Sequence, residues 1–311
     1  MPTLRVASLL AAGTEILYAL GSGECVVAVS HECDYPPEVA RKPRVTRANV
    51  RSEESSKAID DHVRQLAHAG RPLYEIDVPQ LAALAPHLIV TQSPCEVCAV
   101  SSEMVLAAIA GFDSLKSARV VSLNPTSLER IFDDIRRVGE ATGSERKAAD
   151  YVALLERRTD SVRRVTEGIP VSRHARVLCI EWIEPLMVAA NWMPDLVHLA
   201  GGINGLTKPG ERSRCAAWSD AVAFDPEVIV IAPCGFDLPR TLREAVALRS
   251  LPGWGRLSAV QNRRVFAADG NAYFNRSGPR IVDSLEILAT LIHPSLFPVA
   301  SPERLEVYSA F

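Results

Sequence analysis

Side chains that could hold a metal ion or contact a ligand follow several apolar segments of this sequence. The motif Cys95-Glu96-Val97-Cys98 has the spacing of metal-binding and redox thiols. A zinc site needs four ligands, so His31, Cys33 or Cys234 would have to complete it. The residues alone leave four interpretations open: a metal site, a redox pair, a ligand contact, and two thiols that only shape a loop.

His31 follows the apolar segment Cys25–Ser30, which we predict to be a strand. A neutral imidazole is a good ligand for cobalt or iron when a carboxylate such as Asp34 holds its other ring nitrogen. A loop histidine that makes an ordinary hydrogen bond is the competing interpretation. His31 is therefore a candidate contact and not an assigned metal ligand.

Aromatic side chains of the second half of the chain predict a surface for a flat ligand. Trp182 and Trp192 lie at predicted strand ends or in loops, and Tyr273 and Phe274 lie in the polar segment Asn271–Arg276. Stiff rings bind flat macrocycles with little loss of rotamer freedom. For Trp182, burial in the core is an equally good interpretation.

Arg276 is the charged member of that polar segment. Its planar guanidinium could donate several hydrogen bonds to amide carbonyls or a phosphate of the ligand. An ion pair with Asp283 or Glu286 is the alternative.

A duplicated segment predicts the architecture that positions these residues. Val78–Ser93 and Trp218–Pro233 each place an amphipathic stretch before a proline, followed by a polar residue and three apolar residues. Such a pattern indicates a helix stopped by proline and followed by a buried parallel strand. A second apolar strand follows each copy at a similar distance, at Arg119–Leu123 and Arg264–Ala267. We therefore predict two similar α/β lobes with mainly parallel sheets, and a ligand cleft between them.

The sequence pattern changes at residues 125–168, where it predicts a helix. Apolar residues recur there at a helical period between charged residues. About 40 residues of helix would form one long backbone helix between the lobes, unless Gly139 and Gly143 break it in two. The predicted division is a lobe at residues 1–124, a backbone helix linker at 125–168 and a second lobe at 169–311.

Composition excludes several classes of function. The chain of 311 residues has 48% hydrophobic and 23% charged residues and a net charge of −3, which predict a globular protein without affinity for nucleic acid. Motifs for phosphate loops, serine hydrolases and zinc proteases are absent, so we predict a protein that is not an enzyme and uses no catalytic cofactor.

The cellular location is predicted from the N-terminus and the cysteines. Residues 1–6 lead straight into a strand with no leader pattern, and no apolar run is long enough to span a membrane. Seven cysteines do not form a recognisable disulfide framework. We expect a cytoplasmic protein that is not membrane-embedded and is a monomer, or a periplasmic one if a leader was removed.

The chain resembles class III substrate-binding proteins of ABC importers, closest to the cobalamin-binding branch. The resemblance rests on Arg5–Leu9, Gly13–Leu17, Asp34–Pro37 and Arg276–Ile281, together with the duplicated strands. It implies two lobes joined by a backbone helix and non-catalytic binding of cobalamin, a related corrinoid or another metal chelate, for transport, carriage or sensing. A permease partner, if the protein is exported, would dock on surface acids such as Glu103 and Asp220.

The ligand is expected beyond the carboxyl ends of the parallel strands, where such sheets bind small molecules. The predicted ligand-binding residues are His31, Cys33, Tyr35, Gln92, Cys95, Cys98, Trp182, Trp192, Cys234, Asn271, Tyr273, Phe274 and Arg276. The alternative function is a zinc-, iron- or haem-binding protein that uses Cys33, Cys95, Cys98, Cys234 and His31.

Overall fold

The computed structural model describes residues 4–51, 53–92, 101–298 and 308–310. The chain forms two compact units. Unit 1 comprises Met1–Glu54, Ala58–Asn124 and Glu129–Leu154, and unit 2 comprises Ser55–Lys57, Pro125–Leu128 and Leu155–Phe311. None of the helices in the described ranges is both long and apolar enough to cross a membrane.

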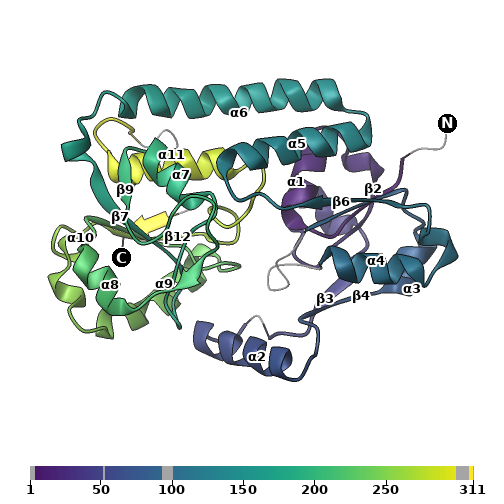
Figure 1. Cartoon of the computed structure of the whole chain (residues 1–311), viewed down its shortest axis with the longest axis horizontal. Helices are drawn as coiled ribbons and strands as arrows, with labels where there is room; N and C mark the ends of the chain where they lie inside the picture. The colour runs from purple at the N-terminus through teal and green to yellow at the C-terminus, as the bar shows by residue number, and fades with distance from the viewer. Residues whose placement is uncertain (1–3, 52, 93–100, 299–307, 311) are drawn as a thin grey trace. The chain divides into compact units, whose positions relative to one another are not determined.

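Unit 1 is built on a parallel sheet with the strand order β2-β1-β5-β6 (Figure 1). Its strands are β1 (Val6–Ser8), β2 (Val26–Val29), β5 (Leu88–Gln92) and β6 (Arg119–Leu123). The uninterrupted apolar runs predict strands buried on both faces, as parallel sheets require. Val6, Ile89 and Val90 are indeed fully buried.

Helices cover both faces of this sheet. They are α1 (Ala11–Ala19), α3 (Val78–Ala83), α4 (Ser102–Ala110) and α5 (Leu128–Thr142). Helices α1 and α5 lie on one face, and α3 and α4 lie on the other (Figure 1). A separate antiparallel pair, β3 (Thr46–Ala48) and β4 (Tyr74–Ile76), is connected through α2 (Ser56–His68). The helix predicted near residues 55–68 is thus confirmed, whereas the sequence did not predict the strand pair around it.

The helical segment predicted at residues 125–168 is present, and of the two alternatives the structure has the broken one, because the chain turns after Thr142. Helix α5 ends there, Gly143 adopts a left-handed conformation with φ of +68°, and α6 (Glu145–Thr166) then runs for 22 residues. At 1.5 Å per residue α6 is about 33 Å long. Gly139 remains inside α5, where a Cβ atom would lie 2.4 Å from the Cβ of Ala148 on α6. Gly143 therefore makes the turn, and Gly139 lets the two helices pack closely.

Unit 2 has a larger sheet with the strand order β10-β8-β7-β11-β12-β13, and β9 also pairs with β7. Its strands are β7 (Ala175–Trp182), β8 (Met187–Val188), β9 (Gly202–Asn204), β10 (Arg214–Cys215), β11 (Val228–Ile231), β12 (Val265–Ala268) and β13 (Tyr308–Ala310). The central strands β7, β11 and β12 are parallel, whereas β8, β10 and β13 add antiparallel strands at the edges.

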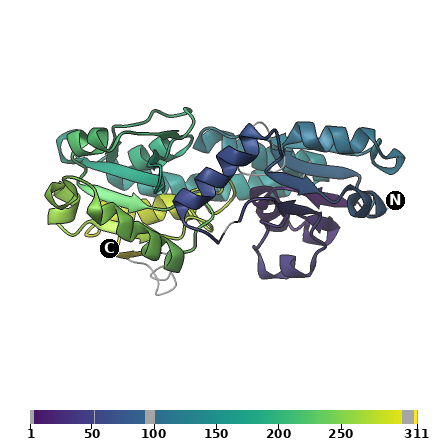
Figure 2. The same cartoon turned by 90° about the horizontal axis from the view of Figure 1, so that it is seen from below.

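The helices of unit 2 form two layers around this sheet. They are α7 (Met193–Leu199), α8 (Trp218–Phe224), α9 (Leu238–Ala245), α10 (Ser258–Gln261) and α11 (Ile281–Ile292). Helices α7 and α11, with the second half of α6, lie on one face, and α8, α9 and α10 lie on the other (Figures 1 and 2). The apolar core under α8 and α9 includes Ile180, Ile229 and Ala245.

The predicted duplication is confirmed in three dimensions. The units α3–β5–β6 and α8–β11–β12 have the same order and the same parallel pairing. In both, the residue before the proline has positive φ: Ala85 at +39° and Asp225 at +45°. An arginine of the neighbouring segment locks each turn, because Arg5 Nε donates to the carbonyl of Leu84 at 2.9 Å and Arg176 Nε donates to that of Phe224 at 3.1 Å. The same turn, with a residue of positive φ and an arginine hydrogen-bonded to it, therefore shapes both copies of the duplicated segment.

Candidate functional site

The carboxyl ends of the parallel strands bring polar and aromatic side chains together in each unit, as predicted. In unit 1, His31 follows β2 and lies beside Thr46 of β3 and Tyr74 of β4. Tyr35, a few residues further along, is 44% exposed. We call His31, Tyr35, Thr46 and Tyr74 the histidine edge.

Hydrogen bonds fix the imidazole of His31. Its Nδ1 atom lies 2.7 Å from Oγ1 of Thr46, which also accepts the backbone N–H of His31 at 3.0 Å. The Nε2 atom lies 3.2 Å from a carboxylate oxygen of Glu32. The partner of Nδ1 is thus a hydroxyl rather than the predicted carboxylate of Asp34. Nε2 is buried and makes no hydrogen bond within the described residues in spite of this short distance, so among these residues the ring is held through Nδ1 alone.

Cys33 does not belong to this edge, so its prediction as a ligand contact is corrected. Its side chain has no exposed surface. The Sγ atom lies 3.0 Å from Oγ1 of Thr14 and 3.3 Å from Oγ of Ser30, beside the start of α1. Hydroxyl groups that share hydrogen bonds with a thiol hold it inside the fold. Cys33 therefore anchors the turn that presents His31.

The remaining unit 1 predictions fall at the end of β5. Gln92 is its last residue, is partly exposed and pairs with Ser101 just before α4. Cys95 and Cys98 lie outside the described residues. Within the described ranges, no group of three or more histidine, cysteine, aspartate or glutamate residues is placed to hold a metal ion.

In unit 2, Trp182 ends β7 and contacts Phe236, the central member of a group of three side chains. Its ring lies 5.2 Å from that of Phe236, a fully buried residue that follows β11. The guanidinium of Arg240 covers the Phe236 ring at 3.6 Å. The indole N–H of Trp182 donates to the carbonyl of Ser56 at 3.2 Å, in the segment grouped with unit 2. Trp182 is half-buried, so one part of a rigidly held indole remains at the surface.

The loop after β12 provides the second part of this surface. Asp269 accepts the backbone N–H groups of Asn271 and Ala272 at 2.9 and 2.7 Å, which folds the chain into a turn. Tyr273 follows, half-buried, with the guanidinium carbon of Arg280 5.4 Å from its ring centre. We call Trp182, Arg240, Tyr273 and Arg280 the aromatic edge.

Two predicted contacts of this loop are buried and shape it instead. Phe274 is 2% exposed, and Arg276 is 8% exposed. The φ of +63° at Phe274 directs its ring inward, while Trp192 donates its indole N–H to the Phe274 carbonyl at 2.7 Å. Nη2 of Arg276 donates to Oδ1 of Asn271 at 2.9 Å. Direct ligand contact by the side chains of Phe274 and Arg276 is therefore not supported, because neither has appreciable exposed surface.

Burial, with smaller contributions from nearby charges and hydrogen bonds, shifts the pKa of the phenol and of the carboxylate in this loop. Burial raises the pKa of Tyr273 and, to a lesser degree, so does the carboxylate of Asp283, while Arg280 acts in the opposite direction. Burial also raises the pKa of Asp269, against its two backbone hydrogen bonds. The phenol of Tyr273 thus stays protonated at neutral pH and is suited to donating a hydrogen bond.

Other predicted residues have defined positions. Cys234 is partly exposed after β11, and its backbone N–H donates to the carbonyl of Glu181 at 3.1 Å. Glu103 and Asp220 are exposed in the first turns of α4 and α8. Glu103 begins the helix that follows β5, whereas Asp220 begins the helix that precedes β11, so the two acids lie at different places in the repeated α/β unit.

Sequence reasoning missed Thr46, Tyr74, Phe236, Arg240 and Arg280. Phe236 could have been found, since it follows a predicted strand by the same rule that selected Cys234. Thr46 and Tyr74 belong to two three-residue strands inside a polar region, where no periodic signal is long enough to read.

Two α/β units with candidate binding residues beyond their strands define a substrate-binding protein fold. Residues 6–272 match the family described as periplasmic binding protein, and the chain belongs to this family, in its class III. It is a non-catalytic binding protein.

Three similar proteins illustrate the range of the family. The uncharacterized ABC transporter substrate-binding lipoprotein YvrC of Bacillus subtilis is 24% identical over 298 residues, which cover 94% of this chain and 81% of that protein. The periplasmic vitamin B12-binding protein BtuF of Vibrio cholerae superposes with a TM-score of 0.67 at 22% identity, covering 94% of this chain and 98% of that one. The periplasmic haem-binding protein RhuT from Roseiflexus superposes with a TM-score of 0.69 at 21% identity, covering 94% and 99%.

Proposed function

We propose that this protein binds a cobalamin or a related corrinoid without converting it, and that the aromatic edge makes the main contact. The observation that carries the proposal is Trp182, a half-buried indole fixed from below by Phe236 and at its N–H by Ser56. A ring held in this way loses little freedom when a flat ligand packs on it. The vitamin B12-binding relative from Vibrio cholerae supports this choice of ligand class.

The energies are sufficient for useful affinity. A corrinoid that covers several hundred Å² of apolar surface gains on the order of 10 kcal/mol at about 25 cal/mol per Å², before the cost of association. Arg240 and Arg280 add hydrogen-bond donors beside the rings, which suit the amide carbonyls at the rim of a corrinoid.

Haem is the competing ligand, and His31 is the observation that favours it. An imidazole must offer an unprotonated nitrogen to iron. In this structure, Nε2 is buried 3.2 Å from a carboxylate oxygen of Glu32, while Nδ1 lies 2.7 Å from the hydroxyl of Thr46. Ligation through Nε2 would need a movement of Glu32 that exposes this atom. A corrinoid that brings its own lower ligand requires neither change.

Titration separates these candidates. The purified protein is mixed with hydroxocobalamin, haemin and a ferric hydroxamate siderophore, and binding is followed by calorimetry and visible absorption. We expect a dissociation constant for hydroxocobalamin of about 1 µM or lower, with a nearly unchanged corrinoid spectrum because no protein nitrogen replaces the cobalt-bound water. Tight binding of haemin together with no corrinoid binding at about 100 µM would reject the proposal.

A permease of the ABC type is the proposed partner, through Glu103 and Asp220. Both carboxylates are exposed, one in each unit, and each lies in the first turn of a surface helix. Glu103→Lys and Asp220→Lys are expected to leave ligand affinity unchanged and to abolish ligand-dependent stimulation of a reconstituted transporter. Equal stimulation by wild type and by the double variant would remove these acids as docking residues.

A further inference from the structure

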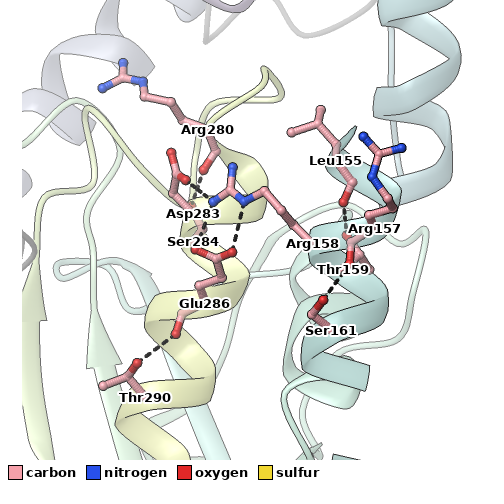
Figure 3. A network of polar contacts seen from close by, with 10 residues as sticks. All are labelled: Leu155, Arg157, Arg158, Thr159, Ser161, Arg280, Asp283, Ser284, Glu286 and Thr290. Carbon is pink, nitrogen blue, oxygen red and sulfur yellow. Dashed lines mark hydrogen bonds and ion pairs between the residues drawn. The ribbon is translucent and has the colours of Figure 1, made fainter. Parts of the chain in front are cut away.

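Arg158 connects the helix that both units share to the helix that follows the aromatic edge. It lies on α6, three residues after the point where α6 enters unit 2. Its guanidinium donates from Nε and Nη2 to the two carboxylate oxygens of Glu286 at 2.9 and 2.8 Å, and Nη2 also contacts Asp283. Figure 3 shows Arg158 reaching from α6 to both acids of α11.

The protonation of Arg158 is secure in this network. Burial lowers the pKa of its guanidinium, but the hydrogen bonds to Glu286 and Asp283 outweigh burial and raise the pKa above its ordinary value. The three side chains are 30%, 30% and 19% exposed for Arg158, Asp283 and Glu286. A half-buried bidentate pair of this kind is more strongly coupled than an ion pair on the surface.

The first turns of α11 in turn hold the loop of the aromatic edge. Ser284, next to Asp283, accepts the backbone N–H of Phe274 at its Oγ atom, 2.9 Å away. Arg280, the residue just before α11, hydrogen-bonds to the phenol of Tyr273. Figure 3 shows the guanidinium of Arg280 pointing away from Asp283 and Glu286. Arg158, rather than Arg280, therefore balances the two acids in this view of the network.

Two carboxylates one turn apart on α11 repel each other if they lose this partner. Asp283 also lies close enough to Tyr273 to influence its phenol. Loss of Arg158 would thus leave two like charges one turn apart on α11, on the same helix whose Ser284 holds the loop.

We propose that Arg158 is a positioning residue for ligand binding, which fixes the Tyr273 loop by pairing with Asp283 and Glu286 on α11. The proposal rests on the proposed function for its affinity readout, because Tyr273 and Arg280 are taken as ligand contacts. Through Arg158, the position of α6 is therefore coupled to the order of the Tyr273 loop.

Hydrogen exchange of the ligand-free protein tests the structural half of this proposal. In Arg158→Met, amides of residues 270–285 are expected to exchange about tenfold faster than in wild type, while those of α9, on the other face of the sheet, keep their rates. Arg163→Met is the matched control, since it removes an exposed ion pair with Asp160 at 2.8 Å on the same helix. It should leave the loop unchanged.

Ligand affinity tests the functional half. Arg158→Met should weaken hydroxocobalamin binding by about fivefold or more. Arg158→Lys keeps the charge without the fork and should give an intermediate loss. Adding Asp283→Asn and Glu286→Gln to Arg158→Met removes both negative charges of α11 and should restore much of the affinity, which a purely structural role would not predict. In a cycle with Tyr273→Phe, the two losses should not add.

The outcomes separate the two proposals. If wild type binds no corrinoid, haemin or siderophore, the proposed function fails, and the exchange experiment still decides whether Arg158 orders the loop. If wild type binds and Arg158→Met matches it in affinity and in loop exchange, the inference about Arg158 is overturned. A uniform rise in exchange across the chain, with no preference for residues 270–285, also overturns it. Should Arg158→Met not fold, Arg158→Lys carries the same comparison.

Discussion

Replacement of Trp182 gives the sharpest test of the aromatic edge, because the hydrogen bond of its indole N–H and the contact of its ring can be removed separately. Trp182→Phe keeps a ring against Phe236 but loses the N–H that donates to Ser56 at 3.2 Å. A hydrogen bond of this kind contributes about 1 kcal/mol, so the free energy of unfolding should fall by that amount. Ligand affinity should change by no more than about twofold, because an apolar ring remains.

Trp182→Ala removes the ring as well. The contact with Phe236 is worth about 0.5–1.5 kcal/mol beyond area burial, and its loss adds to the fall in stability. If the exposed part of the indole carries the ligand, binding should weaken by about 1–3 kcal/mol, which is roughly 5- to 150-fold. Chemical denaturation measures the first quantity, and calorimetric titration with hydroxocobalamin measures the second.

Trp218 offers a matched control within unit 2. It too contacts an aromatic ring, that of Trp254 at 6.0 Å, and donates its indole N–H to a carbonyl, that of Pro252 at 2.8 Å. Trp218→Phe and Trp218→Ala should therefore reduce stability like the Trp182 variants and leave affinity unchanged. The reasoning fails if Trp182→Ala binds as tightly as wild type, or if Trp218→Ala weakens binding just as much.

Two further predictions concern stability. Gly139→Ala should destabilise unit 1 by about 1–3 kcal/mol, because the new Cβ atom would overlap Ala148; this cost exceeds the gain from the better helix propensity of alanine. Gly111→Ala is the control, since the new Cβ atom would lie 3.7 Å from its nearest neighbour, and this variant should be nearly neutral in thermal unfolding. Asp134 is 4% exposed, and burial raises its pKa. The folded state therefore favours the protonated carboxyl group. The resulting stabilisation is fully present below the ordinary carboxylate pKa of about 4 and is lost as the pH rises through the raised pKa. Asp134→Asn should therefore stabilise the protein by on the order of 1 kcal/mol at pH 7 and have little effect near pH 4, and an equal effect at both pH values would contradict this assignment.

The fold was predictable because its signal lies in segments that repeat. A proline after a short amphipathic helix and three apolar residues after that proline are properties of the local sequence, and they occur twice. The break between α5 and α6 was less predictable, since Gly139 and Gly143 look equivalent in the sequence. Only the structure distinguishes a glycine required by its positive φ from one required by the close approach of Ala148.

The sequence predicted which residues lie at the strand ends, but not which way their side chains point. The strand-end rule selected His31, Cys33 and Trp182, and all three lie at or just after the carboxyl ends of β2 and β7, because the end of a strand follows from where its apolar run stops. Whether a side chain at that edge faces outward depends on partners far away in the sequence. Cys33 turns inward because hydroxyl groups of Thr14 and Ser30 receive it.

The partner of Asp283 and Glu286 could not be predicted from the sequence either. The spacing of Asp283 and Glu286 on one face of α11 is visible in the sequence, and the two acids imply a cation. The sequence suggested Arg276, which is close along the chain, as that cation. The structure supplies Arg158 from α6 instead, and engages Arg276 with Asn271. A residue that is remote in sequence thus holds the two acids, and this remoteness is what makes it able to couple the shared helix to the binding loop.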